Sequence, residues 1–229
     1  MHDAMTPEAR VIRAGLALAA ARPWSDVSLL DIAAEAKITL ADLRRHFGSK
    51  GEILAAFARA IDDELLAEAR PRGAGQSARD AVFEVVMSRF DRLAPYRAAL
   101  KSIHAAGAAD PSLARALLAS QAWMLNAAGV ATDGIGGGIR VAGLASVYAS
   151  VFAIWLEDDD PGLARTMAAL DRRLRRGERT LSSLDELVSA AQRVASLFTG
   201  GGRAAGQPSA GSGAAAAKDA AAPGPASAG

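Results

Sequence analysis

The sequence predicts an all-α protein in which a small N-terminal head of three helices precedes a larger helical body. Apolar residues recur at helical spacing in almost every segment, and the alternating pattern that is typical of strands is missing. Proline and glycine clusters divide the chain into segments of helical length. The expected helices cover residues 6–22, 28–36, 39–47, 49–70, 77–93, 95–106, 111–129, 137–157, 161–176 and 182–199.

Residues 28–47 have the layout of a helix-turn-helix. In the first piece, apolar residues at i, i+3, i+4 and i+7 follow Ser28, a good N-cap. Lys37 and Ile38 then form the turn. The second piece begins at Thr39, whose hydroxyl can cap the helix or reach a phosphate. Its buried face is expected to hold Leu40, Leu43 and Phe47.

This pattern resembles that of the TetR-type bacterial repressors. The matching positions are Ala36, Ile38, Thr39, Leu43, His46, Phe47 and Lys50, with Ile12, Ala14, Ala17, Leu18, Ala21 and Trp24 upstream. The chain departs from the family at two positions, where Lys37 replaces a turn glycine and Arg44 replaces a tyrosine. Lys37 must therefore adopt a left-handed conformation at some cost or use a different turn. Asp42 adds an anion to the second helix, where it would face DNA.

The resemblance implies a double-stranded DNA operator as partner, read by the second helix of the motif. Base-edge contacts are expected from Thr39, Leu40, Arg44 and Arg45. Phosphate contacts, or bracing of the head, are expected from Ser28, His46 and Lys50. The family resemblance further implies a homodimer that represses transcription in the cytoplasm until a hydrophobic small molecule binds the body.

Composition excludes several classes of site. The 229 residues contain no cysteine, which excludes disulfides and thiolate chemistry, and the three histidines are too scattered to suggest a metal cluster. The formal net charge is +1, so affinity for nucleic acid must come from local placement of basic residues. No catalytic or phosphate-binding motif is found. We therefore expect neither an enzyme nor a cofactor.

The body carries most of the bulky apolar residues. At helical spacing these are most simply a core, and the alternative is a pocket for a hydrophobic effector. The candidate pocket residues are Phe83, Met87, Phe90, Trp123, Met124, Tyr148, Phe152 and Trp155. The apolar window at residues 141–156 is short for a membrane span and is interpreted as a buried helix.

Small residues recur in the helix expected at residues 137–157, where they would let another helix approach closely. An amphipathic segment at residues 163–174 follows. A two-fold dimer interface or packing within the chain would each explain this pattern. The candidate interface residues are Ala142, Ser146, Ala149, Ala153, Met167 and Leu170.

The segment from Trp155 through the acidic run 157–160 to Leu174 resembles a second family, the lipid-binding proteins of coenzyme-Q biosynthesis. These share the TetR-like fold, and the resemblance implies an alternative function as a lipid-binding accessory protein without DNA binding. The acidic run also has a simple explanation at a helix N-terminus, where the dipole favours carboxylates. In that family a terminal amphipathic helix lies on membranes. Here the mixed polar face of residues 182–199 favours packing on the protein over a membrane surface.

The expected domains are a DNA-binding head at residues 1–50, a ligand-binding and dimerisation body at 51–199, and a disordered tail at 200–229. The tail is rich in Gly, Ala, Pro and Ser and offers almost nothing to bury. The N-terminal residues lack the basic start and apolar run of a signal peptide, so a cytoplasmic location is expected.

Overall fold

The computed structural model describes residues 6–107 and 110–177. The chain divides into two compact units, residues 1–183 and 184–229, and every described residue belongs to the first. The helix expected at 182–199 and the tail expected at 200–229 lie outside the described residues. The described part is helical and contains no strand, as the sequence predicts.

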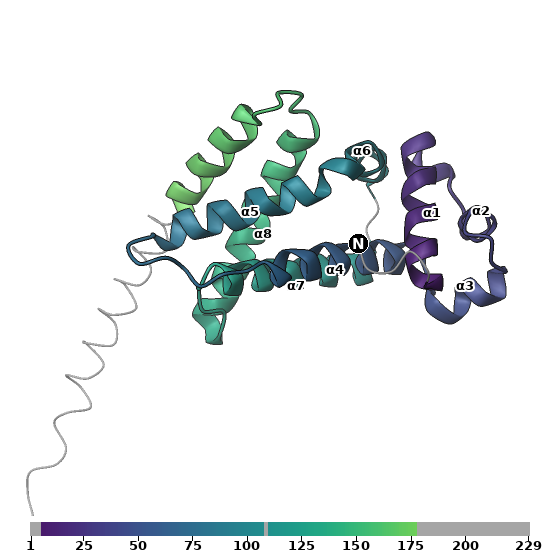
Figure 1. Cartoon of the computed structure of the whole chain (residues 1–229), viewed down its shortest axis with the longest axis horizontal. Coiled ribbons are helices and arrows are strands. Elements are labelled where there is room, and N and C mark those ends of the chain that lie inside the picture. Colours follow the sequence, from purple (N-terminus) through teal and green to yellow (C-terminus); the bar gives the residue numbers. More distant parts are fainter. Residues whose placement is uncertain (1–5, 108–109, 178–229) are drawn as a thin grey trace, which may run out of the picture. The chain divides into compact units, whose positions relative to one another are not determined.

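Three helices form the head and lie together in Figure 1: α1 (Pro7–Ala21), α2 (Leu29–Glu35) and α3 (Leu40–His46). A 3₁₀ turn at Trp24–Asp26 connects α1 to α2 and buries the Trp24 ring. The side chains of the head core are less than a tenth exposed and come from all three helices and their connections: Val11, Trp24, Val27, Ile32, Ala33, Leu43 and Phe47.

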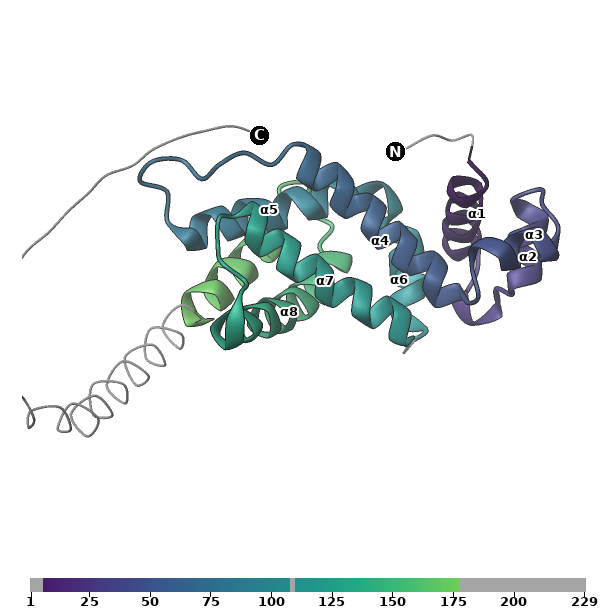
Figure 2. The ribbon, with the colours of Figure 1, turned by 90° about the horizontal axis from the view of Figure 1, so that it is seen from below.

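The body follows as α4 (Lys50–Ala67), α5 (Ala78–Leu93), a 3₁₀ turn at Ala94–Tyr96, α6 (Arg97–Ala105), α7 (Pro111–Ala127) and α8 (Gly134–Leu156). A further helix covers residues 164–177. Helix α4 packs along α7 and also contacts α1 of the head and α5 of the body (Figures 1 and 2). The domain boundary expected after residue 50 therefore falls in the first turn of a helix that both parts share.

Side chains at the helix starts explain why most helices begin where they do. Five hydroxyls accept a hydrogen bond from the amide three residues ahead, which satisfies a donor that the first turn leaves unpaired. They belong to Thr6, Ser28, Thr39, Ser49 and Ser77.

Helix α8 begins three residues earlier than the sequence predicts. The glycines from Gly134 to Gly138 were expected to interrupt helices, but they form the first turns of α8. Glycine is required at Gly137, because a Cβ there would lie 2.0 Å from the carbonyl oxygen of Thr132. Helix propensity alone could not reveal this close backbone approach, which keeps glycine inside a helix despite its entropic cost.

The expected burial of α8 is also only half right. Within residues 141–156 one face is buried and includes Leu144, Tyr148, Val151 and Trp155, whereas Ala142, Ser146, Ala149 and Ala153 are exposed. The helix is long and apolar enough to cross a membrane by length and composition, and 28% of its most apolar window is buried. Core helices of other proteins pass the same test, so this property does not make it a membrane span.

The helix at residues 164–177 begins three residues later than expected, because two carboxylates of the acidic run cap it. The Asp160 carboxylate accepts from the Ala164 amide (3.0 Å). The buried Asp158 carboxylate accepts from the Thr166 hydroxyl (2.7 Å) and amide (2.8 Å). Burial would raise the pKa of Asp158, but these hydrogen bonds outweigh it and the pKa is lowered. The acidic run therefore has the capping role that its sequence suggests.

Candidate nucleic-acid interface

The turn between α2 and α3 is built around Lys37, which adopts the left-handed conformation with φ of 56°. The Lys37 amide donates to the Ala34 carbonyl (3.1 Å), and the Ile38 amide donates to the Ala33 carbonyl (3.0 Å). This pair of bonds is the Schellman arrangement, in which the left-handed residue is usually glycine. Of the two alternatives that the sequence left open, the chain uses the left-handed one.

A capping network fixes the start of α3. The Thr39 hydroxyl donates to the Asp42 carboxylate (2.7 Å) and accepts from the Asp42 amide (3.0 Å). The Arg45 guanidinium pairs with the same carboxylate at 2.5 Å. The hydrogen bond from Thr39 is the main reason that the pKa of Asp42 is lowered. Asp42 is therefore an ionised residue whose charge is partly neutralised within α3.

The opposite faces of α3 have different roles. Leu43 and the C-capping Phe47 are buried and fix the helix against the head core. Leu40 was expected on this buried face, but it is 45% exposed because it begins the helix and faces solvent. Arg44 and Arg45 are exposed as well, and the Arg45 side chain is 73% exposed. The exposed face thus offers one aliphatic side chain and two guanidinium groups.

His46 and Lys50 connect parts of the head to each other. The Nδ1 atom of His46 lies 2.6 Å from the Glu8 carboxylate on α1. The Lys50 ammonium donates to the carbonyls of Trp24 (2.8 Å) and Val27 (2.7 Å) and lies 4.7 Å from the centre of the Trp24 ring. Burial lowers the pKa of Lys50. This geometry is that of a brace, one of the two roles expected for Lys50.

Ser28 is committed to a capping box with Asp31. Its hydroxyl accepts from the Asp31 amide (3.1 Å), while the Asp31 carboxylate accepts from the Ser28 amide (2.8 Å). Arg22 also pairs with this carboxylate at 2.8 Å. The hydrogen bond from the Ser28 amide is the largest contribution to the lowered pKa of Asp31. These contacts fix the start of α2, the helix before the turn.

The N-termini of α4 and α7 meet at Asp110, which connects the head to the body. The Asp110 carboxylate accepts from the amides of Ser112 (2.8 Å) and Leu113 (3.3 Å) and from the Ser49 hydroxyl (3.1 Å). A Cβ at Gly51 would collide with this carboxylate, so glycine makes the approach possible. No local pattern in the sequence indicates these connections between α4 and α7.

The candidate effector residues of the body do not form one hollow. Trp123 is 54% exposed, whereas Phe90, Met124 and Trp155 are fully buried. The Phe90 ring stacks on Tyr148 (5.3 Å) and on Trp155 (5.2 Å), and Phe152 stacks on Trp155 (5.6 Å). Phe83 and Met87 are half-buried against the core. The aromatic side chains therefore fill the space between their helices by stacking on one another.

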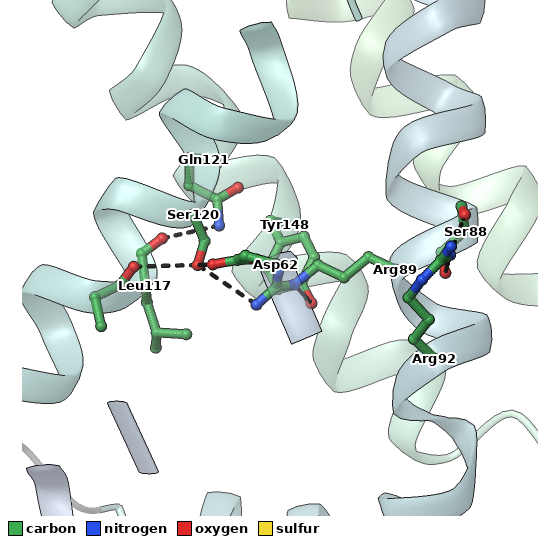
Figure 3. A network of polar contacts seen from close by, with 9 residues as sticks. Asp62, Ser88, Arg89, Arg92, Leu117, Ser120, Gln121 and Tyr148 are labelled. Atoms are coloured by element: carbon green, nitrogen blue, oxygen red, sulfur yellow. Dashed lines mark hydrogen bonds and ion pairs between the residues drawn. The ribbon is translucent and has the colours of Figure 1, made fainter. Parts of the chain in front are cut away.

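A buried polar cluster lies beside these rings (Figure 3). Asp62 of α4 and Arg89 of α5 form an ion pair, and both are nearly inaccessible to solvent. The Ser120 hydroxyl of α7 donates to Asp62, and Arg89 donates to the Tyr148 hydroxyl of α8 (3.1 Å). Burial raises the pKa of Tyr148. The cluster connects four helices, and Asp62, Arg89 and Ser120 were not among the residues predicted from the sequence.

A polar residue at an apolar helical position could have signalled this cluster. Val82, Val86 and Phe90 define the buried stripe of α5, and Arg89 lies on the same stripe. A charged side chain at such a position needs a buried partner, because an unpaired buried charge is costly.

The candidate dimer residues divide between surface and core. Five are exposed: Ala142, Ser146, Ala149 and Ala153 on α8, and Met167, which is 38% exposed. Leu170 is fully buried inside the chain. On α8 the exposed small residues continue a row that starts at Ile135 and Ile139, with alternating steps of four and three residues.

The described residues define a class of protein, in which a helix-turn-helix head is carried on an all-helical body. Comparisons with known proteins agree with this class. Residues 11–57 match the family model described as bacterial regulatory proteins, tetR family. Residues 140–180 match the model described as COQ9. Both resemblances seen in the sequence are thereby confirmed, each over part of the chain.

Solved structures of TetR-type regulators share the fold. A TetR transcriptional regulator from Nitrosomonas europaea is 23% identical, with a TM-score of 0.56, over 74% of this chain and 96% of that one. One from Rhodococcus sp. RHA1 is 20% identical, with a TM-score of 0.57, over 76% and 96%. One from Streptomyces coelicolor is 17% identical, with a TM-score of 0.54, over 82% and 86%. No curated protein sequence matches the chain. The chain has the TetR fold.

Proposed function

We propose that this protein is a cytoplasmic, homodimeric, DNA-binding transcriptional regulator that represses its target and releases its operator when a hydrophobic small molecule binds. The observation that carries the proposal is the exposed face of α3. Leu43 and Phe47 hold this helix in the head core, while Leu40, Arg44 and Arg45 extend into solvent. Arginine is well suited to bidentate contacts with guanine in the major groove.

The ion pair between Asp42 and Arg45 bears on how α3 would contact DNA. Asp42 neutralises part of the positive charge of α3, and it also restrains the Arg45 guanidinium. Arg44 has no polar partner among the described residues. We therefore assign base reading to both arginines, with Thr39 and Leu40 at the helix N-terminus beside them. Ser28 and His46 remain candidates for phosphate contact, and Lys50 supports the head.

The exposed row on α8 supports a dimer. Its spacing of four and three residues is the seam along which helices pack in left-handed bundles, and small residues allow close approach. We assign the two-fold interface to Ala142, Ser146, Ala149 and Ala153, with Met167 at its margin. The buried Leu170 would support that surface from inside. A two-fold dimer would recognise two half-sites of a palindromic operator.

Selection of binding sites from random double-stranded DNA tests the regulator without knowledge of the operator. The full-length protein should enrich a palindromic sequence, and its binding should weaken as salt is raised. Arg44→Ala and Arg45→Ala should each weaken binding to the selected site by about 1 to 3 kcal/mol and relax preference at one base position. Arg115→Ala is the matched control, because this exposed arginine lies on α7 of the body.

Enrichment that both head variants lose and the Arg115 variant keeps supports α3 as the reading helix. Equal binding by all four proteins would refute the assignment to Arg44 and Arg45. Absence of any enriched sequence would refute the regulator itself.

The match of residues 140–180 to the COQ9 model supports a second candidate, a lipid-binding accessory protein of ubiquinone biosynthesis that does not bind DNA. The exposed apolar row at Ile135 and Ile139 would then contact lipid or a partner enzyme. Mass spectrometry of lipid extracted from the purified protein tests this candidate. Recovery of isoprenoid lipid together with failure of the DNA selection would favour it over the regulator.

A further inference from the structure

A cavity of about 470 Å³ lies between head and body, outside the aromatic group of the body. Its walls are α1, α4 and the segment that begins α6. Leu16, Phe57 and Ile61 form its buried floor, and the Phe57 and Tyr96 rings meet edge to face at 5.0 Å. The volume is within the range of pockets that hold small organic ligands, about 300 to 1,000 Å³.

The cavity differs from the body core because no side chain fills it. In the body, the rings of Phe90, Tyr148 and Trp155 stack on one another, and the Asp62–Arg89 pair occupies the space beside them. At the junction, by contrast, several wall positions are alanines, which leave room that a larger side chain would take. Ala17 and Ala60 face this space from α1 and α4.

The charges around the cavity indicate what kind of molecule it would accept. Most wall residues are apolar, and the charged ones are Glu8, Arg13 and Glu64. These are two carboxylates and one guanidinium, and the Glu8 carboxylate also lies 2.6 Å from Nδ1 of His46, so the charge preference is assigned to Glu64. Glu64 lies near enough to Tyr96 to help raise the pKa of that hydroxyl, although burial is the larger cause. A carboxylate on a bound molecule would be repelled here, whereas an ammonium or hydroxyl group would be accepted.

We propose that this junction cavity is a binding site for a small apolar molecule that is uncharged or cationic. An occupant would contact α1 of the head together with α4 and α6 of the body. Its binding would change the packing of α1 against these helices, and through α1 the position of α3. This regulatory consequence rests on the proposed function, whereas the binding itself does not.

Three probes with the same ten-carbon chain test the site: 1-decanol, decylammonium and decanoate. Isothermal titration calorimetry with the full-length protein, below the micelle concentration of each probe, measures affinity and stoichiometry. Decanol and decylammonium should bind with one molecule per chain, and decanoate should bind at least tenfold more weakly. In Glu64→Gln, binding of decanol should persist while the preference for decylammonium over decanoate falls.

Two substitutions that fill the cavity from opposite walls locate the binding. Ala60→Leu and Ala17→Leu should each reduce decanol affinity at least tenfold. Ala67→Leu is the matched control, because it adds the same atoms to an exposed position on α4 outside the cavity. Melting of each unliganded variant checks that it is folded, and the second wall variant covers the case in which one fails to fold.

Two results would overturn the proposal: none of the probes binds, or decanol binds equally well to both filled variants. Binding of decanol that both filled variants lose establishes the site whether or not the protein binds DNA. Failure of the DNA selection would therefore remove only the regulatory consequence.

Discussion

Lys37 ends α2 in a left-handed backbone conformation, which strains the head at this one residue. Helices α6 and α7 end at Gly107 and Gly129, both with positive φ, whereas α2 ends at a lysine in the same conformation. For a residue with a Cβ this conformation costs about 1 to 2 kcal/mol. The Ile38 side chain, which packs against the core, and the two Schellman hydrogen bonds offset that cost.

Replacing Lys37 by glycine should therefore stabilise the head. We expect Lys37→Gly to raise the free energy of unfolding by about 1 kcal/mol, because the backbone strain is removed and the lysine side chain is exposed. Urea denaturation followed by circular dichroism measures the change. Gly129→Ala makes the reverse change at the end of α7, and a loss of about 1 kcal/mol is expected. A destabilised Lys37→Gly protein would contradict the strain argument.

Residue by residue, the sequence predicted local contacts better than contacts between distant segments. The caps at Ser28 and Thr39 follow from spacing within one turn, and both are found. The brace formed by Lys50 depends on the carbonyls of Trp24 and Val27, which are more than twenty residues away. No local pattern specifies those partners, so the sequence left phosphate contact and bracing as alternatives for Lys50.

At the scale of the helices, the polar cluster around Asp62 and Arg89 specifies how four helices fit together. We expect the pair to favour one arrangement of these helices, because any other would leave a buried charge without its partner. The sequence predicted α5 almost residue for residue but not the role of Arg89, because periodicity identifies a buried face without naming the partner of a charge on it.

Removing one member of the Asp62–Arg89 pair should lower the free energy of unfolding more than removing both. Arg89→Met leaves the Asp62 carboxylate buried without its cation, so we expect a loss of about 3 to 5 kcal/mol in the free energy of unfolding. In the double variant Asp62→Leu/Arg89→Met, at least half of that loss should be recovered. Guanidinium denaturation of the three proteins gives the comparison. A double variant that loses as much stability as Arg89→Met, or more, would contradict the coupling of the two side chains.

For the whole molecule, the exposed row of small and apolar residues on α8 matters most, because two chains would associate along it in the proposed dimer. The sequence predicted an α8 that packs through small residues, but it could not separate contacts within the chain from contacts between chains. The structure separates them by burial: Tyr148 and Trp155 face the core, while Ala142, Ser146 and Ala149 remain exposed.

A charge in this row should abolish the proposed dimer. In a two-fold interface Ala149→Glu introduces two carboxylates that would be buried without partners, at a cost of about 3 kcal/mol or more. Sedimentation equilibrium should show the dimer affinity weakened by roughly a hundredfold or more, and circular dichroism should show the helical content unchanged. Ala78→Glu, at an exposed position in the first turn of α5, should leave the oligomeric state as it is. A wild-type monomer would contradict the proposed dimer.

Helix α4 runs without interruption from the end of the helix-turn-helix into the body, where it packs along α7. Its 18 residues span about 27 Å. One residue inserted near its middle would rotate one end relative to the other by about 100° and advance it by about 1.5 Å. The number of residues in α4 thus sets the rotation of the proposed DNA-reading face of α3 relative to the proposed dimer seam on α8. Insertions should be far less tolerated here than in the loop at residues 69–76, where length carries no such phase.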